Sequence, residues 1–254
     1  MMHRIVTDEV LDGLSEDEPA AMRSRRDLQR IHRMMGTRSI LFKALRTLCA
    51  SSAQGAPLRV LELGAGDGSL MLGVARALKG EWPAVELTLL DRQRLVTSET
   101  LASYTRLGWA AKSLVVDVFE WADSPFIGVN GLTQPGKSSY WDVIVTNLFL
   151  HHFEGRALAQ ILAAIALRTG RFFACEPHRA RLALAGSHLL GAIGANAVTR
   201  EDAVLSVRAG FRDQEISALW PQVDAGWTLH EYSAGLFSHC FRAEKHETFE
   251  RTKS

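Results

Sequence analysis

Cysteine is scarce in this sequence of 254 residues, which has only Cys49, Cys175 and Cys240, and the three lie far apart. None of them has the CxxC or Cys/His spacing that is typical of a structural metal site. So sparse a set does not make a disulfide framework, and it favours reduced thiols in a cytoplasmic protein.

A surplus of charge of one sign is also missing, because 29 lysines and arginines are matched by 28 aspartates and glutamates. Proteins that bind nucleic acid through its phosphates usually have a marked basic excess. We therefore expect no nucleic-acid partner. The arginine-rich stretch between residues 23 and 33 is interpreted as a solvated helix face.

No apolar run is long enough to span a bilayer. The longest apolar stretch, Ala180–Ala197, is interrupted by Arg181, His188 and several glycines, whereas a spanning helix needs roughly 20 predominantly apolar residues. The first 20 residues are acidic and polar, unlike a signal peptide. With an ordinary hydrophobic fraction of 47%, the sequence predicts a globular protein without membrane contact.

Strand-like and helix-like segments alternate through the middle of the chain. Short apolar segments predict strands, and the segments between them have apolar residues at helical spacing. Repeated strand–helix–strand units require right-handed crossovers and a largely parallel sheet. Residues 122–140 lack periodicity and predict an irregular connection. The predicted strands are Leu58–Leu63, Val85–Leu90, Leu114–Phe119, Trp141–Thr146 and Arg171–Cys175.

Both ends of the chain add to this sheet domain. Trp227–Tyr232 and Leu236–Glu244, joined by a tight turn at Ser233–Gly235, predict an antiparallel hairpin at one edge of the sheet. Residues 1–50 have helical patterning, and Ser51–Pro57 is typical of a linker. The sequence thus predicts an α/β fold, in which residues 58–254 form a doubly wound, Rossmann-like, mostly parallel sheet of seven strands.

The segment Glu62–Gly68 reads Glu-Leu-Gly-Ala-Gly-Asp-Gly and lies between the first predicted strand and a helix. Glycines there let the backbone turn sharply and let a ligand approach the main chain. The spacing is G-x-G-x-G, whereas dinucleotide-binding proteins have G-x-G-x-x-G. The carboxylate of Glu62 would repel a pyrophosphate and attract an ammonium group.

Two further carboxylates belong to neighbouring strands. Asp91 closes the second predicted strand, where a carboxylate can accept hydrogen bonds from both hydroxyls of a ribose. Asp117 lies in the third predicted strand, next to Val118, and suits an adenine amino group. Together with the glycine turn, these positions favour a nucleoside that carries an amino-acid portion.

This order of motifs resembles the class I methyltransferases that depend on S-adenosylmethionine (SAM). The resemblance implies SAM as cofactor, S-adenosylhomocysteine (SAH) as its product, and no metal. It also implies that residues 1–50 cover the cofactor crevice as a helical lid, with Met34, Met35 and Gly36 toward the ligand. The residues that it assigns to the cofactor are Glu62, Gly64, Ala65, Gly66, Asp91, Arg92, Asp117, Val118 and Asn147.

A second motif runs from Asp142, which opens the fourth predicted strand, through Asn147 to the adjacent pair His151 and His152. Crevices of open α/β sheets lie at the carboxyl ends of the strands, so Asn147 and both histidines should border the methyl-transfer site. Neutral histidine suits a general base near pH 7. We expect His151 or His152 to act as the base or to contact the acceptor; alternatively, such a histidine only caps the following helix. Two adjacent histidines without partners at ligand spacing predict no metal site.

The region after the fifth predicted strand resembles a bacterial subgroup of these methyltransferases, found beside polyketide and other natural-product genes. In that subgroup the strand ends in Asp-x-x-Arg, whereas here Glu176 replaces the Asp and Cys175 replaces the preceding Asn. A later Ser-Val-Arg ends at Arg208. The resemblance implies a small aromatic or polyketide-like acceptor, methylated at oxygen, with His178, Arg179 and Arg208 in its pocket. Surface salt bridges and helix caps are the alternative roles for these three.

Two other functions stay open at this point. A non-catalytic protein that binds SAM as a partner module would have the same motifs. A nicotinamide-dependent oxidoreductase would need a G-x-G-x-x-G turn and a catalytic tyrosine, and neither Tyr104, Tyr140 nor Tyr232 has such a context. For the leading hypothesis we expect a small-molecule substrate and a monomer or homodimer.

Overall fold

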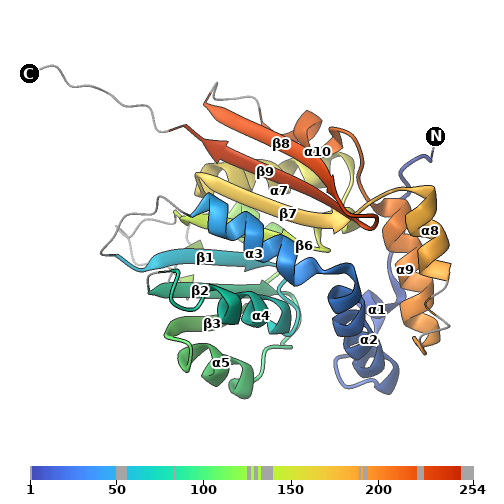
Figure 1. Ribbon diagram of the computed structural model, residues 1–254, viewed down its shortest axis with the longest axis horizontal. Coiled ribbons are helices and arrows are strands. Elements are labelled where there is room, and N and C mark those ends of the chain that lie inside the picture. Colours follow the sequence, from blue (N-terminus) through green and yellow to red (C-terminus); the bar gives the residue numbers. More distant parts are fainter. Residues whose placement is uncertain are drawn as a thin grey trace, which may run out of the picture.

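The structure is a computed structural model with a seven-stranded sheet at its centre (Figure 1). It describes residues 2–49, 56–82, 84–124, 127–128, 131–132, 140–188, 190, 194–221 and 226–246. In spatial order the strands are β3 (Trp109–Val115), β2 (Val85–Asp91), β1 (Leu58–Leu63), β6 (Val143–Asn147), β7 (Arg171–Pro177), β9 (Ser238–Lys245) and β8 (Trp227–Ala234).

The pairing confirms a mostly parallel, doubly wound sheet. Strands β1, β2, β3, β6 and β7 pair in parallel, whereas β9 is antiparallel to β7 and to β8. The chain builds outward from β1 to β3 and then crosses to the other side of β1 to form β6. The order therefore reverses between β1 and β6, and open α/β sheets bind their ligands at such a switch point.

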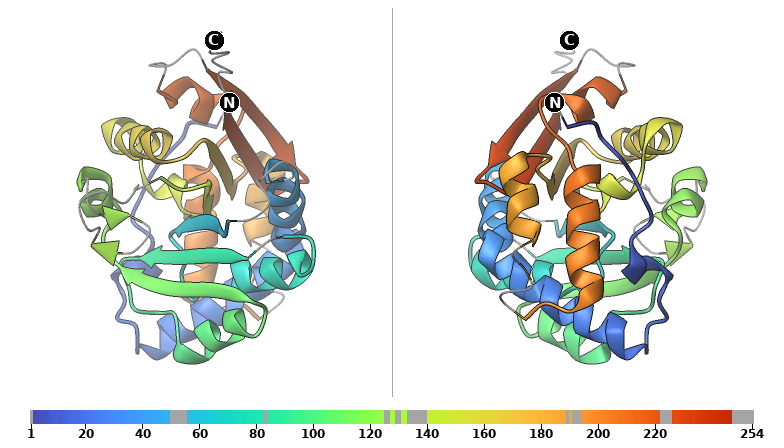
Figure 2. Two further views of the ribbon diagram at one scale, coloured as in Figure 1. Left: turned by 90° about the vertical axis from the view of Figure 1, so that its left-hand side faces the viewer. Right: turned by 90° about the vertical axis from the view of Figure 1, so that its right-hand side faces the viewer.

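Helices cover both faces of the sheet, as the two views of Figure 2 show. Residues alternate between the faces along each strand, so Val60 packs in one apolar cluster with α3 and α4, and Leu61 packs in another with α6 and α7. Strands buried on both faces explain the nearly continuous apolar runs in the sequence. The helices that flank the sheet are α3 (Thr37–Leu48), α4 (Ser69–Leu78), α5 (Ser98–Thr105), α6 (Val118–Asp123), α7 (Gly155–Arg168) and α10 (Glu215–Leu219).

Four further helices gather beyond the carboxyl ends of the parallel strands (Figure 1). Two come from the start of the chain, and two follow β7; α1 and α2 both contact α9. These helices are α1 (Val10–Gly13), α2 (Pro19–Met35), α8 (Arg181–His188) and α9 (Ala197–Ala209). No helix in the described part of the chain is both long and apolar enough to cross a membrane.

The predicted 1–50 segment is divided in the structure. Only α1 and α2 lie beyond the strand ends, whereas α3 packs against α4 and β7 and contributes Leu41, Leu45 and Leu48 to the core. The helix α3 is therefore part of the sheet layers. Residues 51–55 of the predicted linker lie outside the described residues.

The third predicted strand, Leu114–Phe119, is wrong in its position. The strand is Trp109–Val115, and it begins directly after Gly108, whose φ of 82° forms the preceding turn. Asp117 does not lie in a strand: its side chain accepts a hydrogen bond from the backbone N–H of Phe119 at 2.8 Å and caps α6. An aspartate at the N-cap competes effectively with strand propensity.

The remaining differences are small. The hairpin turns at Gly235, with φ of 73°, so β8 continues to Ala234 and the turn follows it. Part of the predicted irregular connection forms a short hairpin of β4 (Ile127–Gly128) and β5 (Gly131–Leu132). Residues 125–126, 129–130 and 133–139 of that connection lie outside the described residues.

Candidate active site

A cavity of about 420 Å³ lies at the carboxyl ends of β1, β2 and β6, where the strand order reverses. Its walls come from the turns that follow these strands, from the start of α6, from residues 7–12 and from one face of α2. Ser206 of α9 also lines it. The cavity thus occupies the position at which this class of sheet binds ligands.

The turn after β1 is built from glycines in the left-handed region. Gly64, Gly66 and Gly68 have φ values of 69°, 56° and 72°. A Cβ on Gly64 would lie 2.3 Å from the ring of Phe149, whereas a Cβ on Gly66 would meet no atom within 4 Å. Gly64 therefore allows a close contact within the protein, and Gly66 leaves open space beside the cavity that it lines.

Two buried acceptors face this cavity without a partner. Glu62 Oε2 and Asn147 Oδ1 accept no hydrogen bond from any residue that the structure describes. Burial, and then the carboxylates of Asp67 and Asp91, raise the pKa of Glu62 to about 8. Buried acceptors without donors are costly, so this pair suits a ligand that brings a donor, above all a cationic one.

The carboxylates of Asp91 and Asp117 are both fixed by backbone groups at the cavity wall. Asp91 accepts hydrogen bonds from the N–H of Gly66 at 2.8 Å and of Gln93 at 2.9 Å, so it ties the end of β2 to the glycine turn. Arg92 forms an ion pair with Asp12 at 3.1 Å. All nine residues predicted to hold the cofactor line this one cavity: Glu62, Gly64, Ala65, Gly66, Asp91, Arg92, Asp117, Val118 and Asn147.

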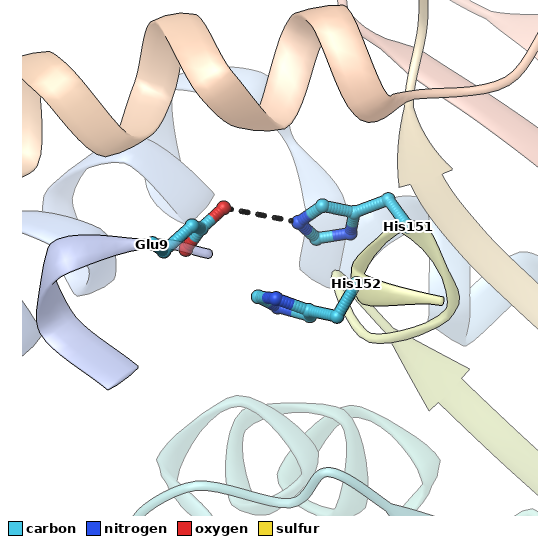
Figure 3. Close-up of side chains that lie close together, drawn as sticks. All are labelled: Glu9, His151 and His152. Carbon is cyan, nitrogen blue, oxygen red and sulfur yellow. Dashed lines mark hydrogen bonds and ion pairs between the residues drawn. The ribbon is translucent and has the colours of Figure 1, made fainter. Parts of the chain in front are cut away.

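His151 and His152 line the same cavity from the short helix η1 (Leu150–His152) that follows β6. Their rings lie close together, with centroids 4.2 Å apart and planes tilted by 34°. His151 contacts Glu176 Oε2 through Nδ1 at 2.9 Å. Its Nε2 lies 3.3 Å from Glu9 Oε1, and Figure 3 shows this second contact. His152 Nδ1 lies 3.4 Å from Asp12 Oδ2. Neither histidine acts merely as a cap for the next helix.

The pKa values of the two histidines are shifted in opposite directions. Burial by itself would lower the pKa of His151, but the hydrogen bonds with Glu176 and Glu9 outweigh it and raise the pKa to about 9. Burial, and then the charge on His151, lower the pKa of His152. The pair therefore combines one readily protonated ring with one that resists protonation.

Glu176 organises the turn that carries the histidines. It is fully buried, and its carboxylate accepts hydrogen bonds from the backbone N–H groups of Phe149 (3.1 Å) and Leu150 (3.0 Å) as well as contacting His151. This residue stands where the resembling subgroup has an Asp. The carboxylate at this position therefore acts on the β6 turn.

Several cavity residues come from the first 35 residues, but they are not the ones that the resemblance implies. Glu9 reaches His151, and the side chain of Gln29 donates to Asp67 at 2.7 Å. His32 Nε2 is buried without a partner among the described residues, and burial lowers the pKa of His32 to about 4. Met34, Met35 and Gly36, which we expected to face the ligand, are not among the residues that line the cavity.

The prediction of no metal site rested on the two histidines alone. Ligand atoms of Glu9, His151 and His152 lie within 4.8 Å of one another, because Glu9 approaches from 142 residues away. Sequence spacing could not reveal this cluster, since its acidic member lies on a separate segment.

The three residues predicted for the acceptor pocket do not line the cavity. The side chain of Arg179 is only 1% exposed and forms an ion pair with Glu215, and it also donates to the carbonyls of Met2 and Gly210. His178 Nε2 lies 3.4 Å from Ser233 Oγ. Arg208 is exposed in a separate groove between α8 and α9.

Replacing Arg179 by alanine should lower the free energy of unfolding by about 3 kcal/mol, because the carbonyls of Met2 and Gly210 and the carboxylate of Glu215 would each lose a donor. Urea unfolding followed by circular dichroism measures the change. Arg208→Ala is the matched control, since its side chain is exposed, and we expect a change below about 0.5 kcal/mol. Equal stability of the two variants would contradict a structural role for Arg179.

No family model and no curated protein matches the sequence. Solved structures do match the fold of the chain. The plantazolicin methyltransferase BpumL in complex with SAH superposes with a TM-score of 0.60 at 12% identity, over 91% of this chain and 92% of that one. An O-methyltransferase family protein from Burkholderia thailandensis gives 0.57 at 13% identity, over 90% of this chain and 60% of that one.

The mitomycin 7-O-methyltransferase MmcR gives a TM-score of 0.52 at 20% identity, over 93% of this chain and 60% of that one. At these identities the likeness concerns the fold. It supports the resemblance seen in the sequence motifs and agrees with the observed sheet order. The chain has the methyltransferase fold found in these solved structures.

Proposed function

We propose that this protein is a SAM-dependent methyltransferase that acts on a small organic acceptor, at an oxygen atom of an aromatic or polyketide-like compound. The observation that carries the proposal is the convergence of the glycine turn, Glu62, Asp91 and Asp117 on one cavity. The fold shared with BpumL and MmcR supports it, because the one was solved with SAH and the other is a 7-O-methyltransferase of mitomycin.

The residues present fit SAM. Glu62 and Asn147 offer two unpartnered acceptors to an ammonium group, and Gly66 leaves room for a ligand against the main chain. Asp91 stands at the end of β2, where a carboxylate can take ribose hydroxyls. Asp117 and Val118 would border the adenine. When bound, SAM supplies a methyl group that its sulfonium activates.

An aromatic wall supports an aromatic acceptor. Phe119 and Phe149 both pack edge-on against Phe153, with ring centroids 5.5 Å and 5.1 Å apart. All three rings line the cavity together with both histidines. Flat aromatic molecules gain from such edge-to-face surroundings beyond the area that they bury.

For methyl transfer to a hydroxyl, the protein must position the two reactants, exclude water from the pocket and supply a base. Holding two reactants at near-attack distance removes much of the entropic cost of the reaction. A hydroxyl acceptor must also lose its proton, and a histidine that lines the cavity, His151 or His152, would take it. These demands match what the cavity contains.

Calorimetry tests the cofactor part of the proposal. We expect SAM and SAH to bind and NADH not to bind. Asp91→Ala should lower the affinity for SAH by about 30-fold, because the charged hydrogen bonds of Asp91 to the ligand would be lost. Binding of NADH without binding of SAM would overturn the proposal.

Labelled SAM and a panel of phenols test the catalytic part. We expect transfer of label to a phenol, and much less transfer in Asp91→Ala at a SAM concentration close to the Kd of the unmodified protein. A protein that binds SAM but is inert toward phenols, carboxylic acids and amines would instead be a non-catalytic SAM-binding module.

A further inference from the structure

We propose that the two adjacent histidines have separate roles: His151 is a fixed imidazolium held between Glu9 and Glu176, and His152 is the neutral base that faces the acceptor. This inference rests on the proposed methyltransferase function. It makes Glu9, from the first ten residues of the sequence, a positioning residue of the active site.

The contacts of His151 determine its charge. Its Nδ1 lies 2.9 Å from a carboxylate oxygen of Glu176, and its Nε2 lies 3.3 Å from one of Glu9. Ionised carboxylates only accept hydrogen bonds, so each ring nitrogen must carry a proton. With both nitrogens engaged and a side chain only 3% exposed, His151 has no lone pair with which to take a proton from a substrate.

Both carboxylates are held in place by the fold. Backbone N–H groups of the β6 turn fix Glu176. Glu9 also accepts a hydrogen bond from Ser206 of α9. Its segment is anchored on either side, because Arg4 donates to the carbonyl of Phe153 at 2.8 Å and the N–H of Val10 donates to Asp202 at 2.7 Å. The arrangement around His151 is therefore preorganised.

His152 differs in each of these respects. Its side chain is 22% exposed and lines the cavity. Nδ1 lies near Asp12, and no residue in the described part of the chain is hydrogen-bonded to Nε2. The neighbouring imidazolium of His151, at 4.2 Å between ring centroids, disfavours a second positive charge. With its Nδ1 proton toward Asp12, a neutral His152 keeps a lone pair on Nε2 for an acceptor in the cavity that it lines.

The charged groups around the pair come from several elements. Three carboxylates face the rings: Glu9 and Asp12 from the start of the chain and Glu176 from β7. Arg92 pairs with Asp12. Arg4 donates to the carbonyl of His151 and also faces Glu154, Glu176, Glu215 and Arg179. Two of the carboxylates contact His151 directly, and the positive charge on that ring opposes a second proton on His152.

In the proposed transfer step, the acceptor hydroxyl gives its proton to His152 Nε2. A lone pair of the acceptor oxygen forms the new bond to the methyl carbon of SAM. The bond from that carbon to sulfur breaks, and its electron pair stays on sulfur. His151 takes no proton; it keeps His152 neutral and in position.

Nuclear magnetic resonance of the full chain, labelled with ¹⁵N at histidine, reads both charges without any turnover. We expect both nitrogens of His151 to stay protonated up to pH 8 in the presence of SAH, while His152 is neutral at pH 7. His151→Gln and His152→Gln assign the signals. Glu9→Gln should move the titration of His151 at least one pH unit lower. Asp17→Asn, a change of an exposed carboxylate that does not line the cavity, should leave it unmoved.

Two results of this titration would overturn the proposal. One is a His151 that has a deprotonated nitrogen at pH 7. The other is a bound divalent ion, because ligand atoms of Glu9, His151 and His152 lie close enough to share one. Spectra recorded with and without EDTA, together with elemental analysis of the purified protein, detect that ion.

An activity measurement separates this inference from the proposed function. With a phenol that is methylated, His152→Gln should lower kcat at least 100-fold while SAH affinity is retained. Glu9→Gln should shift the pH profile of kcat. Loss of kcat in His151→Gln but not in His152→Gln would reverse the assigned roles, and the methyltransferase function would stand.

Discussion

Gly66→Arg should abolish SAH binding, with an affinity loss of more than about 100-fold, which corresponds to roughly 3 kcal/mol. Gly66 lines the cavity, its φ is 56°, and a Cβ there would meet no protein atom within 4 Å. An arginine side chain would therefore extend into the space that a ligand needs. Calorimetric titration with SAH measures the loss.

Gly80→Arg is the matched control for this variant. Gly80 has a φ of 87° and open space around its Cβ, but it is exposed after α4 and does not line the cavity. Both variants impose the same left-handed strain on a side chain, so a thermal melt of each separates strain from blockage. Equal SAH affinity in the two variants would refute the assignment of the glycine turn to the cofactor.

The affinity for SAM should rise with pH between pH 6 and 8, by up to about tenfold per pH unit, and level off above pH 8. The cause is Glu62, whose pKa burial raises to about 8. Below that pH the free protein holds a proton on Glu62, and the ammonium group of SAM favours the ionised form. Binding therefore releases a proton, at a cost that disappears as the pH approaches 8.

Calorimetry in two buffers of different ionisation enthalpy counts this proton directly. At pH 6.5 we expect close to one proton released per SAM bound. Glu62→Gln should bind SAM more weakly and with no pH dependence in this range. An affinity of the unmodified protein that is flat from pH 6 to 8 would show that Glu62 does not contact the ammonium group.

Local sequence signals were sufficient for most of the sheet. Leu58–Leu63 is bounded by Pro57 and Gly64, and these breakers define β1 to the residue. The third strand was misplaced because Val115–Phe119 is rich in strand-favouring residues on both sides of Asp117. The capping hydrogen bond of that aspartate, which starts α6, is a local interaction that apolar periodicity does not report.

The cofactor half of the site was predictable for a geometric reason. Parallel strands bring their carboxyl ends to one edge, so Glu62, Asp91 and Asn147 converge once their strands are identified. The acceptor half depends on contacts between distant segments. Glu9 and Ser206 meet at His151 although nearly 200 residues separate them, and Arg179 serves the packing of α10 instead of a ligand.

The ring of Phe149 lies between the cofactor half and the acceptor half of the cavity. Phe149 packs against Gly64 of the cofactor turn so closely that a Cβ there would overlap it, and it also contacts Phe153 in the aromatic wall. A cofactor that moves the glycine turn must also displace the ring of Phe149, and this displacement changes the shape of the acceptor half of the cavity. We expect a bound cofactor to change the affinity for the acceptor, and thermodynamic linkage requires that a bound acceptor change the affinity for the cofactor by the same factor.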